Sequence, residues 1–318
     1  MAREILGKMV KNKALDSIGG IIAQGKEATI YRSSGMIDGE PGKYAIKVYK
    51  KKKVEFKNRE KYIIGDIRFK HDVKNENVAI KLWAEKEFRN LKRVKRCGIL
   101  CPDPIMLRFG YNNYPDNRKH IVIMSYIGTD SVPSITLHHY NFSPEKLFEF
   151  YWKLVDIIRK LYHTCGLVHS DLSPYNVLVY DEDLYIIDFA QAVLIDHPYS
   201  MDFLKRDCLN ISNFFYKKKL LNIMTTKELF DYITNDHIED EQFFIQEKMK
   251  EIDERLSNSI DLHKDISLEE NAWLHSHTPQ CLKESTNNSL IIFSPRSLHN
   301  STIKASQQHP LNHTYPDL

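Results

Sequence analysis

The stretch that decides the fold is His163–Val193, HTCGLVHSDLSPYNVLVYDEDLYIIDFAQAV. It contains two short apolar runs of strand type, Val177–Tyr180 (VLVY) and Leu184–Ile187 (LYII). The acidic residues Asp181–Asp183 between them are typical of a tight turn. The pattern therefore predicts a β-hairpin that ends directly in an acidic residue.

Three polar residues take their places from this hairpin. It would hold Asn176, at its start, beside Asp188, at its end, with Asp171 in the loop leading in. Amide and carboxylate oxygens suit Mg²⁺, and a further carboxylate can orient a hydroxyl. The order resembles a protein-kinase catalytic loop and its metal-binding aspartate, with HSD and DFA in place of HRD and DFG. Ordinary turn acids are the alternative for any one residue, but the three together favour the kinase pattern.

Upstream, a lysine lies inside a predicted strand and a glutamate on a predicted helix. Tyr44–Tyr49 (YAIKVY) is a β run whose single lysine, Lys47, needs a partner if it is buried. The helix Ala79–Val94 has an apolar face that includes Glu87 but not Glu85. The residues on this face are Ile80, Trp83, Glu87, Leu91 and Val94. We therefore predict a Lys47–Glu87 ion pair, because an inward glutamate is costly without a partner. A lysine snorkelling from an edge strand is the alternative.

Two strand pairs flank these elements. Near the N-terminus, Ile18–Ala23 and Thr29–Tyr31 read as strands around the turn Gln24–Ala28 (QGKEA), whose backbone N–H groups could cover phosphates. With a single glycine in the turn this signal is weak, and a structural hairpin is the alternative. Further on, Pro104–Tyr111 and His120–Tyr126 predict an antiparallel pair around a turn at residues 112–117.

The second half of the chain predicts helices. Ser143 as N-cap and Pro144 at the first position open a long helix, and Gly166 is a plausible stop. Its apolar positions are Leu147, Tyr151, Leu154, Val155, Ile158, Leu161 and Tyr162. Three more helices are predicted, at His197–Asn213, Met224–Ile233 and Asp240–Leu256. No A-P-E motif or long activation segment follows Asp188.

Composition limits the class of protein. A chain of 318 residues with 42% apolar residues can build one bilobal domain or two ordinary ones. It has no apolar run of about 18 residues and no apolar signal core, so we expect neither a membrane span nor export. The five scattered cysteines indicate reduced thiols in an intracellular protein. Cys97 and Cys101 lack the second pair that a zinc site would need.

The net charge is only +3, but the basic residues cluster. Lys50–Lys53 is followed by Lys57, Arg59 and Lys61, and two smaller groups lie at residues 92–96 and 217–219. Solvated surface is the favoured explanation for any one cluster. Three together make an anionic partner such as RNA reasonable.

These patterns predict an α+β, trimmed bilobal protein-kinase-like fold. We expect an extension at residues 1–16, a β-rich N-lobe with one main helix at 17–127, and a helical C-lobe at 128–258 without an A-P-E activation segment. The N-lobe would include a long, flexible insertion at residues 50–78. The polar residues 259–318 would form a disordered tail.

The chain resembles the RIO family of atypical serine/threonine protein kinases, and most closely the type 1 branch. The resemblance runs from about Gln24 to Asn210. It is carried by the stretches QGKEATIY, YAIKVYK, REKYIIGDIRFKH, WAEKEFRNLKR, CPDPIMLR, IVIMSYIG, LVHSDLSPYNVL, LYIIDFAQAV and HPYSMDFLKRDCLN. The type 2 branch has an N-terminal winged helix, for which the residues before Gln24 are too few.

The resemblance implies a role for each matching residue. Asp171 would be the catalytic acid/base, Asn176 and Asp188 would hold Mg²⁺, and Asp188 could also accept the phosphate. The substrate ATP would be bound at three places. The turn residues Gly25, Lys26, Glu27 and Ala28 would cover the phosphates, and Lys47, supported by Glu87, would bind them. The backbone of Ser125 and Ile127 would bind the adenine.

The resemblance also implies a cellular role. RIO kinases act in maturation of the small ribosomal subunit, so the expected partner is the pre-small-subunit particle, with its rRNA and ribosomal proteins, and not DNA or a membrane. We expect a cytoplasmic ATPase or kinase, with shuttling to the nucleus left open. The alternative is a nucleotide-gated factor that binds pre-ribosomal RNA and protein with negligible turnover.

Overall fold

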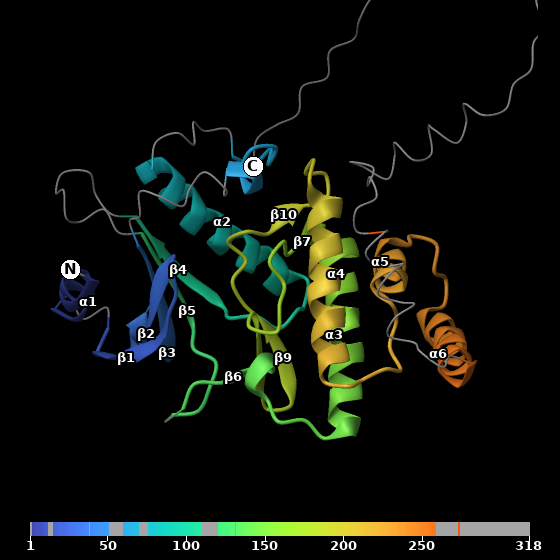
Figure 1. Ribbon diagram of the computed structural model, residues 1–318. Coiled ribbons are helices and arrows are strands. Elements are labelled where there is room, and N and C mark those ends of the chain that lie inside the picture. The colour runs from blue at the N-terminus through green and yellow to red at the C-terminus, as the bar shows by residue number, and fades with distance from the viewer. Residues whose placement is uncertain are drawn as a thin grey trace, which may run out of the picture. The chain divides into compact units, whose positions relative to one another are not determined.

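The computed structural model describes residues 2–11, 15–37, 39–50, 60–69, 76–109, 120–130, 132–258 and Trp273, all inside one compact unit, Met1–Cys281. A β-sheet lies at one side of this unit and a group of helices at the other, with helix α2 (Glu76–Arg96) between them (Figure 1). The predicted α+β, bilobal kinase-like architecture is confirmed. Among the described helices, none combines the length and the apolar character needed to cross a membrane.

The N-lobe sheet has five strands in the order β1-β2-β3-β5-β4, and all its neighbours are antiparallel. The strands are β1 (Ser17–Gln24), β2 (Ala28–Ile37), β3 (Glu40–Tyr49), β4 (Pro104–Arg108) and β5 (Ile121–Ser125). Lys47 lies on the central strand β3, opposite Ile30 of β2 and Val122 of β5. The edge-strand alternative for this lysine is therefore wrong.

The two faces of this sheet are covered differently. Ile121 and Ile123 of β5 pack with Leu6 and Met9 of helix α1 (Ala2–Lys11). The alternating residues Val122 and Met124 belong instead to the main core, which includes α2. This is the period-two pattern of a strand buried on both faces. The α2 face predicted from its apolar spacing is buried: Ile80, Trp83, Glu87, Leu91 and Val94.

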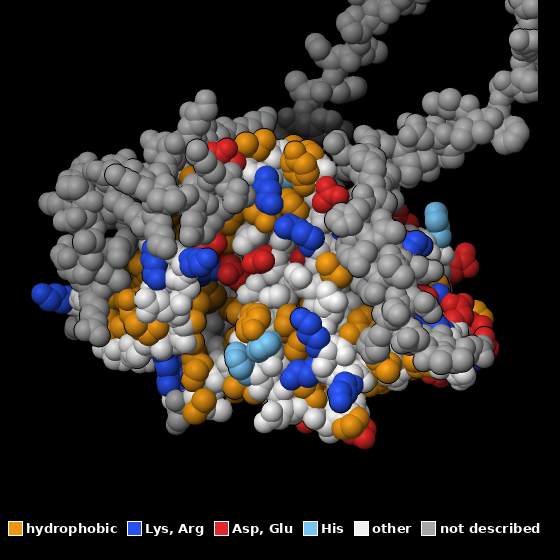
Figure 2. All heavy atoms as spheres, in the orientation of Figure 1, with side chains coloured by type: hydrophobic (Ala, Val, Ile, Leu, Met, Phe, Trp, Pro, Cys, Tyr) orange, Lys and Arg blue, Asp and Glu red, His pale blue; other side chains and the backbone are white. Residues whose placement is uncertain are grey.

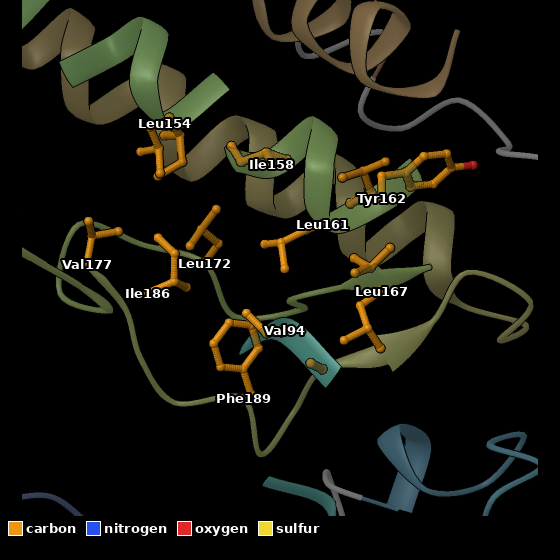
Figure 3. Packing of buried hydrophobic residues seen from close by; sticks show 14 of the residues in the cluster. Val94, Leu154, Ile158, Leu161, Tyr162, Leu167, Leu172, Val177, Ile186 and Phe189 are labelled. Atoms are coloured by element: carbon orange, nitrogen blue, oxygen red, sulfur yellow. The ribbon is translucent and has the colours of Figure 1, made fainter. Parts of the chain in front are cut away.

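The C-lobe is built on helix α3 (Pro144–His163), whose N-cap Ser143 accepts a hydrogen bond from the Lys146 N–H at 3.2 Å. All seven predicted apolar positions of α3 are buried. Leu154, Ile158 and Leu161 point toward Leu172, Ile186 and Phe189 of the segment that carries the candidate site (Figure 3). This packing fixes the predicted hairpin against the helix.

The predicted hairpin is confirmed as β8 (Val177–Tyr180) and β9 (Asp183–Ile186). Asp181 and Glu182 in its turn both have positive φ, 51° and 62°, as in a type I′ turn. Strand β6 (Ile135–Thr136) pairs with β8, and β7 (Leu167–Val168) pairs with β10 (Val193–Leu194). The short 3₁₀ helix η3 (Leu137–His139) follows β6.

Three helices complete the C-lobe: α4 (Ser200–Lys217), α5 (Thr226–Thr234) and α6 (Glu241–Asn258). The predicted start of α4 at His197 is wrong by three residues. Pro198 disfavours helical geometry at the residue before it, and His197 instead bonds the Ile64 carbonyl through Nε2 at 2.9 Å. Helix α5 begins at a capping box formed by Thr225 and Glu228.

Part of the predicted insertion is packed. Residues 60–69 begin with the 3₁₀ helix η2 (Glu60–Tyr62), and Tyr62, Ile63, Asp66 and Phe69 are buried. A solvated loop would not bury these side chains. The predicted end of the insertion at residue 78 is wrong, because residues 76–78 are the start of helix α2. Residues 51–59 and 70–75 lie outside the described residues, as does the predicted tail apart from Trp273.

Candidate active site

A pocket of about 600 Å³ lies between the N-lobe sheet and the β8–β9 hairpin. Figure 2 shows acidic side chains gathered at the hollow between the two sides of the molecule. The pocket brings together nearly all the predicted site residues, from segments far apart in the chain. They are Gly25, Lys26, Glu27, Ala28, Lys47, Glu87, Ser125, Ile127, Asn176 and Asp188. Asp171 does not line the pocket, but its backbone carbonyl accepts a hydrogen bond from Asn176.

Lys47 sits between two carboxylates. Its Nζ lies 2.8 Å from Glu87 Oε1 and 2.9 Å from Asp188 Oδ1. The side chains of Lys47 and Glu87 are only 6% and 2% exposed, so the predicted ion pair is confirmed and desolvated. Burial would lower the pKa of Lys47, but the attraction of Asp188 and Glu87 outweighs it and raises that pKa. Lys47 therefore stays charged and links helix α2 to the end of β9.

Glu87 has a second partner. The Tyr49 hydroxyl donates to its Oε2, while the off-face Glu85 pairs with Arg89 of its own helix at 2.5 Å. Burial raises the pKa of Glu87, opposed by the attraction of Lys47. The choice of Glu87 over Glu85 from the helix phase is thus correct.

Asp188 has the electrostatics of an ionised ligand. Burial would raise its pKa, but the charge and hydrogen bond of Lys47 outweigh this and lower that pKa. Its side chain keeps 36% of its surface exposed, on the pocket side. Its φ of 64° is left-handed, which is uncommon for a residue with a Cβ.

Asn176 is held beside it by the hairpin. The Ile187 N–H donates to the Asn176 carbonyl at 3.0 Å, and Asn176 Nδ2 donates to the Asp171 carbonyl at 2.8 Å. The second hydrogen bond uses the NH₂ group of the Asn176 amide, so the Asn176 Oδ1 atom is available to bind a metal ion. One carboxylate and one amide oxygen fit Mg²⁺, which usually binds few protein ligands together with substrate phosphates. Within the described residues, no group of three or more His, Cys, Asp or Glu is arranged for a metal.

Asp171 lies in the loop before the hairpin. Burial raises its pKa to about 6, helped by repulsion from Asp188 and Glu27. Gln191 Nε2 donates to its Oδ2 at 3.0 Å. A carboxylate with a pKa near the working pH is suited to proton transfer.

Helix α4 anchors this loop through Asp207. Its two carboxylate oxygens accept the N–H groups of Ser170 and Leu172, each at 2.8 Å, on either side of Asp171. Burial raises the pKa of Asp207 to about 8, against the lowering effect of these two donors. Sequence patterns did not predict Asp207. The available signal was its place on the buried face of α4, with Phe203, Leu204 and Ile211.

The other predicted site residues lie in two walls of the pocket, and hydrogen bonds hold each wall in place. Lys50 Nζ donates to the Gly25 carbonyl at 2.6 Å, and Trp83 Nε1 donates to Glu27 Oε2 at 3.2 Å. Both bonds tie the Gln24–Ala28 turn to its surroundings. At the opposite wall the Ser125 N–H donates to the Asp103 carbonyl at 2.9 Å, and the Ile127 carbonyl accepts from the Ser134 N–H at 3.2 Å.

The family model that matches this chain is the RIO domain, over residues 29–229. The chain belongs to the RIO family. "Serine/threonine-protein kinase rio1" of Dictyostelium discoideum is 37% identical over 284 residues, which cover 89% of this chain and 47% of that protein. "Serine/threonine-protein kinase RIO1" of Homo sapiens is 35% identical over 289 residues, covering 90% and 48%. These matches confirm the predicted resemblance to the type 1 branch.

Another RIO relative, "Serine/threonine-protein kinase RIO3" of Homo sapiens, is 39% identical over 246 residues, which cover 74% of this chain and 46% of that protein. The chain thus spans about half the length of the curated relatives it matches. Among solved structures, "WaaP in complex with acyl carrier protein" has 12% identity and a TM-score of 0.39, with 78% of this chain and 92% of that one covered. That similarity is weak, and the RIO assignment does not depend on it.

Proposed function

We propose that this RIO domain transfers the γ-phosphoryl group of Mg·ATP, as an atypical serine/threonine kinase with ATPase activity. The observation that carries the proposal is the buried Lys47, which joins Glu87 to Asp188 in a pocket also lined by Asn176. Nucleotide phosphates need a fixed cation and oxygen ligands for magnesium, and these residues supply both. A γ-³²P-ATP assay, with and without purified pre-small-subunit particles, tests it.

Each residue has a defined task in this scheme. Asp188 and Asn176 would hold Mg²⁺, which when bound neutralises charge on the phosphates. Lys47 binds the phosphates, and the Gln24–Ala28 turn covers them. The Ser125 carbonyl and the Ile127 N–H bind the adenine edge, because the other polar backbone atom of each residue already has the partner described above. Asp171 takes the proton of the attacking hydroxyl or water.

Two acceptors are open for the phosphoryl group. A serine of a bound protein is one, and the Asp188 carboxylate is the other, since it is ionised and must lie near the γ-phosphate to bind metal. In the second case an Asp188 oxygen attacks the γ-phosphorus, the bond to the bridging oxygen breaks, and ADP leaves. Water then attacks the acyl phosphate, releases inorganic phosphate and restores the carboxylate, with Asp171 taking the proton of the water.

Hydroxylamine distinguishes these acceptors, because it cleaves acyl phosphates but not phosphoserine. We expect protein-bound ³²P from γ-³²P-ATP to be released by hydroxylamine and to be absent in Asp188→Ala. Asp183→Ala, at the exposed first residue of β9 in the same hairpin, is the control and should label normally. Label that survives hydroxylamine, or that persists in Asp188→Ala, excludes the aspartyl phosphate.

In the cell, we propose a cytoplasmic role in late maturation of the small ribosomal subunit, with movement through the nucleus left open. The names of the kinase relatives support the chemistry, and the basic clusters support contact with rRNA. The second candidate is a nucleotide-gated binding factor with negligible turnover. The short connection between Asp188 and α4 favours it, since no activation segment is present there to position a peptide hydroxyl.

The RNA contact is expected to depend on the Lys50–Lys53 cluster with Lys57, Arg59 and Lys61. Binding that releases counterions from phosphates weakens steeply with salt, so the slope of log affinity against log salt should become shallower by about 0.7 to 0.9 for each phosphate that a variant no longer neutralises. Because Lys50 also holds the Gly25 turn, one variant lacks the other six charges and a second lacks all seven. Lys160→Gln with Lys227→Gln is the control. An unchanged slope in both test variants would leave the cluster as solvated surface.

A further inference from the structure

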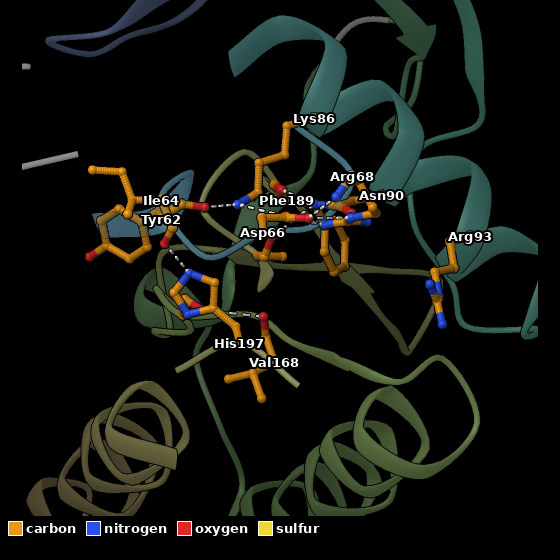
Figure 4. Close-up of polar contacts among 12 residues, drawn as sticks. Tyr62, Ile64, Asp66, Arg68, Lys86, Asn90, Arg93, Val168, Phe189 and His197 are labelled. Atoms are coloured by element: carbon orange, nitrogen blue, oxygen red, sulfur yellow. Dashed lines mark hydrogen bonds and ion pairs between the residues drawn. The ribbon is translucent and has the colours of Figure 1, made fainter. Parts of the chain in front are cut away.

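A buried amide on α2 holds the loop that follows Asp188. Asn90 is fully buried, and its Nδ2 donates to the Phe189 carbonyl at 2.9 Å and the Ala192 carbonyl at 3.1 Å (Figure 4). Asp188 itself has a left-handed φ of 64°, which is uncommon for a residue with a Cβ. The two hydrogen bonds from Asn90 hold the backbone directly after Asp188 and so stabilise Asp188 in this conformation.

Arg68 fixes the direction of that amide. Its NH1 donates to Asn90 Oδ1 at 2.8 Å, so the NH₂ group must face the two carbonyls. Arg68 is held in turn by Asp66 through two parallel bonds, Nε to Oδ1 at 2.8 Å and NH2 to Oδ2 at 2.7 Å. A bidentate pair restricts both rotation and position. We refer to Asp66, Arg68 and Asn90 as the relay.

The relay is fastened to both lobes. Lys86 of α2 lies 3.4 Å from Asp66 Oδ2, with both side chains fully buried, and its Nζ also donates to the Tyr62 carbonyl. On the C-lobe side, His197 accepts the Tyr199 N–H at Nδ1, so its Nε2 is the donor to the Ile64 carbonyl at 2.9 Å. Segment 60–69 is therefore fixed between α2 and the start of α4 (Figure 4).

We propose that the relay positions Asp188 for metal binding, with segment 60–69 supporting the loop that follows Asp188. The inference rests on the proposed function. Helix α2 contacts the Asp188 region twice, one turn apart: Glu87 holds the side chain through Lys47, and Asn90 holds the following backbone. The three members of the relay are positioning residues, because they touch Asp188 only through its neighbours.

Nucleotide affinity with and without magnesium tests the relay independently of turnover. Asn90→Asp keeps an acceptor for Arg68 but replaces the NH₂ group that makes both bonds with an oxygen that repels the two carbonyls. By calorimetry on the full chain, we expect Mg·ATP affinity to fall about 10–100-fold, the usual cost of losing a group that orients a metal ligand. ATP affinity in EDTA should stay within about twofold, because no group that touches the nucleotide has changed.

Two further variants separate positioning from simple destabilisation. Arg68→Met keeps the Asn90 donors but frees the amide to turn, and should show the same magnesium-specific loss, while Arg68→Lys should recover part of it. Lys92→Gln is the matched control, because it changes an exposed side chain on the same helix that contacts only Phe88 in the described structure, and it should change neither affinity. Thermal melts accompany each variant. The proposal is overturned if Asn90→Asp lowers the melting temperature but leaves the ratio of the Mg·ATP affinity to the ATP affinity in EDTA unchanged. If Asn90→Asp does not fold, the same result in Arg68→Met overturns it.

Asp188→Ala separates this failure from failure of the proposed function. If magnesium raises the ATP affinity of the wild type, and Asp188→Ala loses that gain while Asn90→Asp and Arg68→Met keep it, only the relay is wrong. If magnesium has no effect on the wild type, the proposed function itself is wrong, and the relay with it.

Discussion

Replacing Asp171 with asparagine is expected to lower the turnover of ATP about 10²–10⁴-fold, the usual contribution of a positioned acid/base. The amide is nearly isosteric with the carboxyl group and leaves the hydrogen bonds from the Ser170 and Leu172 N–H groups to Asp207 intact, but it cannot accept a proton. The affinity for Mg·ATP should therefore change little. Steady-state hydrolysis, together with calorimetric nucleotide binding, checks both expectations.

The same variant reports on the order of steps. If Asp171 orients the water that resets Asp188, then Asp171→Asn should accumulate the phosphoenzyme or the ATP complex, detected as retained label after rapid filtration. Asp181→Asn is the control, since this exposed residue has a φ of 51° that asparagine tolerates. Wild-type turnover in Asp171→Asn would show that another group is the base.

Replacing Lys47 with methionine should abolish activity, or raise the Michaelis constant for ATP steeply, in a protein that still folds. It should also lower the free energy of unfolding by about 3–5 kcal/mol, because removing one partner leaves the buried Glu87 carboxylate without its counter-charge. A typical stability of about 5–15 kcal/mol tolerates that loss. Urea denaturation and ATP kinetics measure the two effects.

Glu87→Gln completes a double-mutant cycle. The single change should lower activity more mildly, because Lys47 keeps its bond to Asp188 at 2.9 Å. The double variant should lose less stability than the two single losses added together, since the buried Glu87 carboxylate is gone and only the partly exposed Asp188 is left without Lys47. Additive losses would show that the pair contributes no coupling and that Lys47 matters only through the nucleotide.

The elements predicted from local periodicity were largely correct. Helix phase alone separated Glu87 from Glu85, because an amphipathic helix has only one buried face and Lys47 required a buried partner. The hairpin was predicted because its strands and acidic turn are adjacent in the chain. Both signals are local, and the structure confirms the ion pair and the hairpin.

The missed residues depend on contacts between distant segments. Asn90 and Asp207 bond backbone groups that lie about 100 and 35 residues away, and the identity of a backbone partner leaves no trace in a sequence pattern. For the same reason the charged segment 60–69 resembled a solvated loop. Its Asp66 and Arg68 satisfy each other and Lys86 inside the fold, which only the assembled structure shows.

The spacing of Glu87 and Asn90 on α2 has a consequence for how the site responds to movement of that helix. A hydrogen bond near 2.9 Å is largely lost once its atoms separate beyond about 3.5 Å, so a shift of this rigid helix by less than one ångström is enough to break a contact. The contact of Glu87 with Asp188 through Lys47 and the hydrogen bond from Asn90 to the backbone after Asp188 would then be lost together. Movement of α2 would therefore couple the two contacts, so that the site is held at both points or at neither.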